Sequence, residues 1–144
     1  AGLDIHEKPY YEYRILNHWD NLDDTVERGY AGLSMWEWTA KEIPTERIHH
    51  YGELCASVGL NGAVLNNVNA NPLILDKEHI ERVAQIANIL REYGITTYLS
   101  IKWTSPVTLD GLKSGDPLDP KVRQWWKNKA AEIYTAIPIS AAFS

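Results

Sequence analysis

Three short segments of the sequence combine amide, imidazole, indole, ammonium and carboxylate side chains. They are 17–20 (Asn-His-Trp-Asp), 66–71 (Asn-Asn-Val-Asn-Ala-Asn) and 102–105 (Lys-Trp-Thr-Ser). Such polar groups are costly to bury without partners, whereas in a cleft they can bind a polar ligand. No segment has the glycine pattern of a phosphate loop or the spacing of metal ligands. The chemistry that they favour is therefore hydrogen bonding and stacking.

Each segment also has a structural explanation when it is taken singly. His18 could be a hydrogen-bonded turn residue, and the segment 66–71 could be turn chemistry, because Asn tolerates left-handed backbone. Lys102 could be a solvated strand end, and we predict that Asp23 and Asp24 cap a turn or a short helix. The joint occurrence of the three segments at strand ends favours a binding cleft.

Each segment follows an apolar run that predicts a β-strand. The runs are 13–16, 62–65 and 95–101, and the last is rich in β-branched residues. The second and third do not alternate cleanly between apolar and polar residues, which is typical of parallel strands buried on both faces.

Amphipathic helices are predicted between and after these strands. The first begins at Pro44, the second follows a cap at Asp76, and the third follows Asp119-Pro120 and ends before Pro138. Trp125 and Trp126 lie in the third helix, where we interpret them as packing residues without a role in the site.

The alternation of strands and helices predicts an α/β fold with parallel strands and right-handed crossovers. A doubly wound sheet and a (β/α)8 TIM barrel both fit this order, and the absence of GxGxxG favours the barrel. A whole barrel needs about 250 residues. The 144 residues here therefore predict a partial barrel, its first three βα units.

Composition excludes several classes of partner. The net charge is −5 and the basic residues are scattered, so we expect neither a nucleic acid nor a membrane as a partner. Cys55 is the single cysteine, and we predict a buried, inert thiol. No signal-peptide pattern is present, which favours the cytoplasm over secretion and leaves the compartment undetermined. Six Trp and eight Tyr against one Phe suit a wet cleft for sugar rings, although compositional drift would give the same counts.

Three separated motifs resemble those of the family 67 glycoside hydrolases. They are RILNHWDNLD with VERGYAG, HHYGELCASVGLNGAVLNNVNAN, and DPLDPKVRQWW. The resemblance implies an α-glucuronidase that removes (4-O-methyl-)glucuronic acid, α-1,2-linked, from xylooligosaccharides. It implies inversion without a cofactor, by a general acid and a general base that lie beyond this chain, so the chain alone is expected to be inactive.

The resemblance also implies roles for six residues. Trp19 is expected to line the glucuronic acid pocket, with Asp20 as a hydroxyl acceptor. Val68 is expected to contact the sugar, with Asn67 and Asn69 as polar partners. A sixth substrate-binding candidate, Lys102, departs from the family pattern and its role is open; a cation there could meet the uronate carboxylate.

The resemblance assigns residues 1–138 to the N-terminal segment of the catalytic barrel domain and leaves 139–144 as a non-family tail, for which a frameshift is our hypothesis. Sequencing the encoding DNA tests it. Two alternatives to an enzyme segment stay open, a non-catalytic carbohydrate-binding chain and a structural fragment. The fragment would be a homo-oligomer, because an unclosed sheet leaves edges and apolar surface to cover.

Overall fold

The computed structural model describes residues 4–27 and 32–137. Three short strands form one parallel sheet in the order β1 (Ile15–Asn17), β2 (Gly62–Val64) and β3 (Thr96–Tyr98). The predicted α/β class and parallel strand direction are therefore confirmed, and the architecture agrees with a partial barrel. Residues 138–144, which include the predicted tail, lie outside the described residues.

The strands are shorter than the apolar runs that predicted them. The first strand begins at Ile15 rather than at residue 13, because the backbone N–H of Arg14 donates to the side-chain oxygen of Asn61 at 2.8 Å. The third is three residues long instead of seven. Beyond Tyr98 the chain bonds to side chains and turns instead of continuing the ladder.

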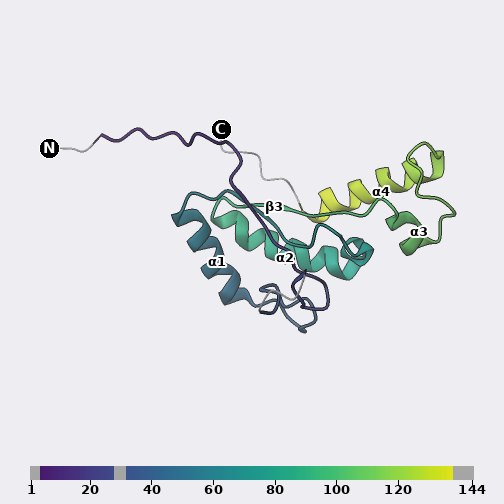
Figure 1. The fold of residues 1–144 in the computed structure, drawn as a ribbon, viewed down its shortest axis with the longest axis horizontal. Coiled ribbons are helices and arrows are strands. Elements are labelled where there is room, and N and C mark those ends of the chain that lie inside the picture. The colour runs from purple at the N-terminus through teal and green to yellow at the C-terminus, as the bar shows by residue number, and fades with distance from the viewer. Residues whose placement is uncertain (1–3, 28–31, 138–144) are drawn as a thin grey trace.

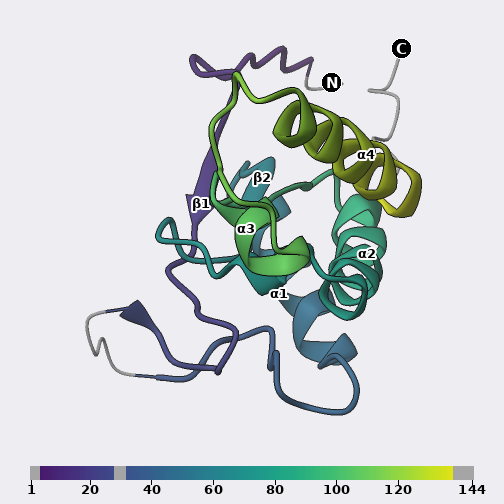
Figure 2. The same cartoon turned by 90° about the vertical axis from the view of Figure 1, so that its right-hand side faces the viewer.

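Three long helices accompany the strands: α1 (Thr45–Ser57), α2 (Lys77–Glu92) and α4 (Pro120–Ala136). Asp76 accepts a hydrogen bond from the backbone N–H of His79 at 2.8 Å, so the predicted cap is confirmed. Asp119 accepts one from that of Lys121 at 2.8 Å and caps the helix that was predicted to start there. The helices stand on one side of the sheet, with α1 packed on α2 and α2 on α4 (Figures 1 and 2).

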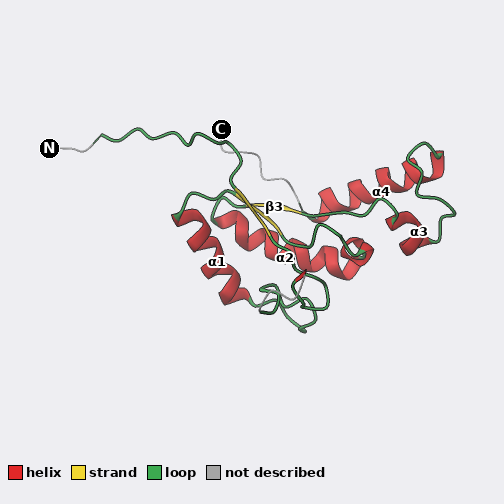
Figure 3. Cartoon of the chain, in the orientation of Figure 1, coloured by secondary structure: helices red, strands yellow, loops and turns green. Residues whose placement is uncertain are grey.

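Two short helices were not predicted. The 3₁₀ helix η2 (Pro72–Leu75) and the helix α3 (Ser105–Asp110) each have a proline in their first turn. Figure 3 shows α3 beside α4, beyond the end of the sheet. Both helices are too short to show a repeating apolar stripe, which is why the periodicity missed them.

The core lies between the sheet and the long helices. It contains Ala63 in β2 and Leu65 directly after it. They belong to one cluster with Ile48 of α1 and with Ile86 and Leu90 of α2, and all five are fully buried. Cys55 is 3% exposed in the same core, as predicted. Packing of the helices on the sheet and on one another therefore contributes apolar burial that stabilises the fold.

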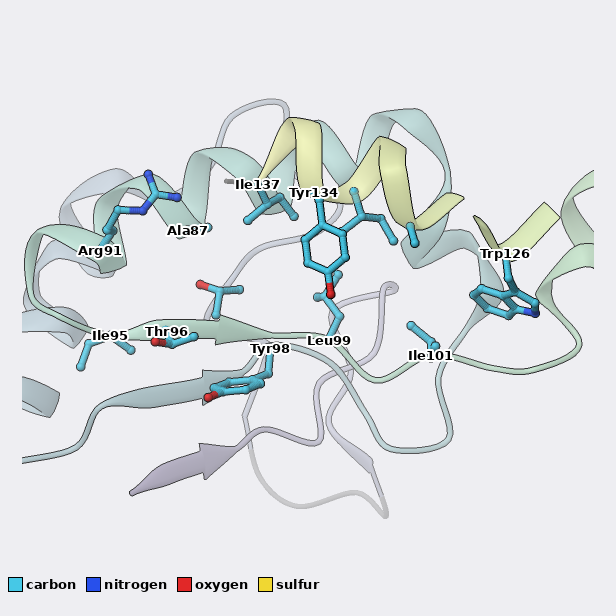
Figure 4. A pocket seen from close by; sticks show the side chains of 13 residues that line it. Ala87, Arg91, Ile95, Thr96, Tyr98, Leu99, Ile101, Trp126, Tyr134 and Ile137 are labelled. Atoms are coloured by element: carbon cyan, nitrogen blue, oxygen red, sulfur yellow. The ribbon is translucent and has the colours of Figure 1, made fainter. Parts of the chain in front are cut away.

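Ile15 and Tyr98 lie on the face of the sheet that points away from the long helices. A Cβ atom at Gly62 would approach Cγ1 of Ile15 and Cε2 of Tyr98 to 2.9 Å each, so these three residues share one face. Figure 4 shows the Tyr98 side chain on the opposite side of β3 from α2 and α4.

A largely apolar groove with a volume of about 360 Å³ runs along β3, beneath α2 and α4 (Figure 4). Among its lining residues are Ile95, Leu99, Ile101, Trp126 and Ile133. It follows the edge of the sheet at which β3 has no neighbouring strand in the part of the chain that the structure describes.

Candidate functional site

The C-terminal ends of the three strands meet at one edge of the sheet. The register pairs Asn17 with Val64 and Val64 with Tyr98. The backbone N–H of His18 donates to the carbonyl of Val64, and that of Leu65 donates to Tyr98, both at 3.1 Å. The polar segments 17–20 and 66–71 therefore begin at the same edge, which we call the strand-end rim, and the segment 102–105 follows the end of β3 after three further residues.

Asp20 lies in the interior of this rim and is only 5% exposed. Its carboxylate oxygen Oδ2 accepts hydrogen bonds from the Ser34 hydroxyl at 2.7 Å and from the Met35 backbone N–H at 3.2 Å. Its backbone carbonyl accepts from the N–H of Asn67 at 2.8 Å, which ties the first rim segment to the second. The structure therefore shows Asp20 holding two loops together.

Asn67 is also turned inward, being 3% exposed. Its side-chain NH₂ donates to Oδ1 of Asn21 at 2.9 Å and to the carboxylate of Glu27, and its side-chain oxygen accepts from the backbone N–H of Asn69 at 2.9 Å. All the hydrogen-bonding groups of this amide are thus engaged within the chain.

The neighbouring Asn66 links the second strand end to the third. It is 2% exposed; its side-chain NH₂ donates to the carbonyl of Ser100 at 3.0 Å, and its side-chain oxygen accepts from the N–H of Ser100 at 2.9 Å. These two bonds extend the hydrogen-bond ladder between β2 and β3 beyond the strand ends, with the Asn66 side chain in place of a backbone group. Sequence reasoning named Asn66 in the polar run but assigned it no role.

Three of the predicted residues face outward or partly so. Val68 is 58% exposed at the tip of the second rim segment, and Asn69 beside it is exposed. Trp19 is half-buried, and its carbonyl accepts a hydrogen bond from the backbone N–H of Glu27 at 2.9 Å. These three residues can offer surface to a ligand at the strand-end rim.

Lys102 is exposed two residues beyond Ser100. Its carbonyl accepts hydrogen bonds from the backbone N–H of Ser105 at 2.9 Å and from the Ser105 hydroxyl at 2.6 Å. This turn carries the chain from β3 into α3 and leaves the Lys102 ammonium at the surface. The segment that follows β3 therefore carries an exposed cation.

His18 forms a buried cluster that sequence reasoning missed. Its Nε2 atom lies 2.8 Å from the Tyr51 hydroxyl, and its ring packs edge-on against Trp36 and Tyr51 at 5.2 and 5.4 Å between centroids. Burial lowers the pKa of His18, and the Asp20 carboxylate, 3.9 Å away, opposes that shift. Burial also raises the pKa of Tyr51. The cluster fixes the chain immediately before Trp19. The position of Tyr51 on the apolar stripe of its helix was the sequence feature that could have indicated this cluster.

Within residues 4–27 and 32–137, no three His, Cys, Asp or Glu side chains are grouped so that they could hold a metal ion. None of the helices described is long and apolar enough to cross a membrane.

Asp23 accepts hydrogen bonds from the backbone N–H and the hydroxyl of Thr25, and Asp24 accepts one from the backbone N–H of Trp38 at 2.6 Å. Asp23 thus caps a turn, as predicted, whereas the Asp24 carboxylate instead holds the distant loop at Trp38 and Thr39.

Comparison with known proteins identifies the family. Residues 1–144 match the family described as the glycosyl hydrolase family 67 middle domain. The chain is 40% identical over 144 residues to a probable alpha-glucuronidase A from Aspergillus terreus and 41% identical over 144 residues to one from Aspergillus oryzae, covering 99% of this chain in each case.

An alpha-glucuronidase A from Emericella nidulans is 42% identical over 141 residues, covering 94% of this chain. In all three comparisons the chain spans 17% of the length of the relative. The family match over all 144 residues and these identities give the assignment. The chain belongs to glycosyl hydrolase family 67, within the middle domain of that family.

Proposed function

We propose that this chain forms one wall of the substrate pocket of an α-glucuronidase. The reaction would be hydrolysis of the α-1,2 bond between (4-O-methyl-)glucuronic acid and a xylooligosaccharide, with inversion. The observation that supports the proposal is the exposure of Val68 and Asn69 and the half-buried state of Trp19 at the ends of the first two strands, with Lys102 exposed in the segment that follows β3. The names of the relatives support the sugar class.

In this proposal Trp19 and Val68 form the apolar side of the uronate pocket. An indole packs well against the apolar face of a sugar ring, and Lys102 offers a cation that can bind a carboxylate through a charge-assisted hydrogen bond. Asp20 and Asn67 would act through the loops that they hold, because Oδ2 of Asp20 and the side-chain amide of Asn67 already have partners within the chain.

We expect the general acid and base to come from other parts of the parent protein. An inverting glycosidase places two carboxyl groups about 6.5–9.5 Å apart around the bond that it cleaves. In this chain, Oδ2 of Asp20 and Oε2 of Glu27 accept hydrogen bonds that hold its loops together, and we assign both carboxylates to that structural role. The purified 144-residue chain should therefore release no glucuronic acid from an aldouronic substrate; sustained release would contradict the proposal.

Calorimetric titration with glucuronic acid tests the pocket directly. The substitution Val68→Asp puts a negative charge at the exposed tip of the rim and should weaken uronate binding about tenfold, through charge repulsion at a few ångströms. Val58→Asp is the matched control, because Val58 is 72% exposed and follows α1, next to the turn that enters β2 at its opposite end. Equal effects of the two substitutions, or no binding by the unmodified chain, would count against a uronate pocket at this rim.

A further inference from the structure

Two histidine–tyrosine hydrogen bonds of nearly the same length join α1 to other parts of the chain. The hydroxyl of Tyr51 in α1 lies 2.8 Å from Nε2 of His18, and Nδ1 of His49 in α1 lies 2.9 Å from the Tyr93 hydroxyl. All four side chains are half-buried. The two bonds hold different parts of the fold. His18 directly precedes Trp19 at the strand-end rim, whereas Tyr93 caps the C-terminal end of α2, beside the turn that enters β3 at its opposite end.

His18 is confined on several sides. Its ring and that of Tyr51 both pack edge-on against Trp36, and the centroids of Trp36 and Tyr51 are 5.4 Å apart at an interplanar angle of 79°. Trp36 is fully buried. Each of the three rings therefore touches the other two, and the close packing leaves His18 little room to change its position.

The residue on the other side of Trp19 is held by the same loop. Asp20 accepts a hydrogen bond from the Ser34 hydroxyl at 2.7 Å, and the oxygen of that hydroxyl accepts one from the backbone N–H of Trp36 at 3.3 Å. The carbonyl of Trp19 itself accepts from the backbone N–H of Glu27. The backbone that carries the Trp19 indole is therefore fixed from both directions along the chain.

The titratable groups around His18 are the Asp20 carboxylate, 3.9 Å from Nδ1, and the Tyr51 hydroxyl, behind which lies the Cys55 thiol of the same helix. Burial lowers the pKa of His18, and burial followed by the Cys55 thiol raises the pKa of Tyr51. At pH 7.5 the bond between His18 and Tyr51 therefore joins two uncharged groups, and its contribution does not depend on an ion pair.

We propose that Tyr51 is a positioning residue for uronate binding, which acts through His18 to set the orientation of the Trp19 indole. The inference rests on the proposed function, in which Trp19 lines the pocket, and adds a residue of α1 that determines affinity. Packing of an indole against a sugar depends on the direction of the ring face. A ring that is already held in the binding orientation loses less freedom when the ligand arrives.

The substitution Tyr51→Phe tests this role, because it removes the hydroxyl and keeps the ring that packs against His18 and Trp36. Calorimetric titration with glucuronic acid at pH 7.5 should show affinity weakened about three- to tenfold, the equivalent of one net hydrogen bond. Tyr93→Phe is the matched control, since it removes a hydroxyl from the same kind of bond to a residue of α1. It should lower the urea midpoint about as much as Tyr51→Phe and leave the affinity unchanged. Equal affinities of the two variants would overturn the inference, because they would leave Tyr51 with a role in stability alone.

A double-mutant cycle tests the route through His18. His18→Gln places an amide near the position of Nε2 and should retain most of the affinity, whereas His18→Ala should lose at least as much as Tyr51→Phe. In the His18→Ala background, Tyr51→Phe should weaken binding no further. A full further loss in that background would contradict the route.

A measurement without sugar separates this inference from the proposed function. The indole N–H signal of Trp19 in NMR spectra of the ¹⁵N-labelled chain, assigned by its absence from Trp19→Phe, should move in Tyr51→Phe and stay in place in Tyr93→Phe. If the unmodified chain binds no glucuronic acid, the uronate pocket fails, and the Trp19 signal still decides whether Tyr51 positions the indole. A Trp19 signal that Tyr51→Phe leaves in place overturns the inference and leaves the uronate pocket standing.

Discussion

The two hydrogen bonds between the Asn66 side chain and the backbone of Ser100 should be a main support of the strand-end rim. Asn66→Ala removes both bonds, which measure 3.0 and 2.9 Å. At a net value of about 0.5–1.5 kcal/mol for each bond, the free energy of unfolding should fall by about 1–3 kcal/mol. For a chain of this length, the middle of that range lowers the melting temperature by about 5–10 °C.

Asn69→Ala is the matched control, because Asn69 belongs to the same run of asparagines but is exposed. It should change the free energy of unfolding by less than about 0.5 kcal/mol. A third variant, Asn66→Asp, keeps the acceptor for the Ser100 N–H but replaces the donor with a carboxylate beside the Ser100 carbonyl. Since that places two acceptors together, Asn66→Asp should not restore stability.

Thermal and urea unfolding followed by circular dichroism measure all three variants. In addition, backbone amide hydrogen exchange at Ser100 should become faster in Asn66→Ala, because that N–H loses its acceptor. The reasoning is wrong if Asn66→Ala and Asn69→Ala unfold at the same urea concentration, since this would mean that the side-chain bonds add nothing to the sheet.

Three further predictions concern packing, protonation and self-association. Gly62→Ala should lower the free energy of unfolding by about 1–3 kcal/mol, measured in urea, because the new Cβ would meet Ile15 and Tyr98 at 2.9 Å; an unchanged midpoint contradicts this. Burial lowers the pKa of His18, so the unfolded chain binds that proton more readily and stability should fall as the pH drops below about 6.5. Urea midpoints compared over that range should show His18→Gln reducing this loss and His50→Gln, at an exposed histidine, leaving it in place. Light scattering should detect a mass above that of one chain at high concentration, because β3 has an open edge beside the apolar groove; a monomer at all concentrations refutes this.

Features set by neighbouring residues could be predicted from the sequence. Asp76 and Asp119 cap their helices through bonds to residues two or three positions ahead, so the pattern and the contact lie in the same short window. The parallel strand order followed from the alternation of elements. The helix α3 also has local sequence signals, Pro106 in its first turn and Gly111, which has a left-handed backbone, at its end. Its six residues are too few to show the apolar periodicity that would have predicted a helix.

The orientation of the rim side chains could not be predicted in this way. Asn66, Asn67 and Asn69 have the same chemistry within four positions, yet the first two are buried and the third is exposed. Their different surroundings depend on Ser100 and Asn21, which are 34 and 46 residues away from their partners. Contacts across such distances depend on how the whole chain folds, and a short motif does not contain that information.

The sheet face that carries Ile15, Gly62 and Tyr98 has consequences for mutational scanning. All three long helices stand on the other face, so in this chain Ile15 remains 37% exposed. In a closed barrel the corresponding face points to the interior and is filled by layers of side chains. Replacing Ile15 with a small polar residue should therefore be tolerated by the 144-residue chain and harmful where the barrel is closed. A mutational scan of the short chain would score substitutions at such positions as harmless. Positions that matter for closing the barrel should therefore be scanned in a chain that contains the whole barrel.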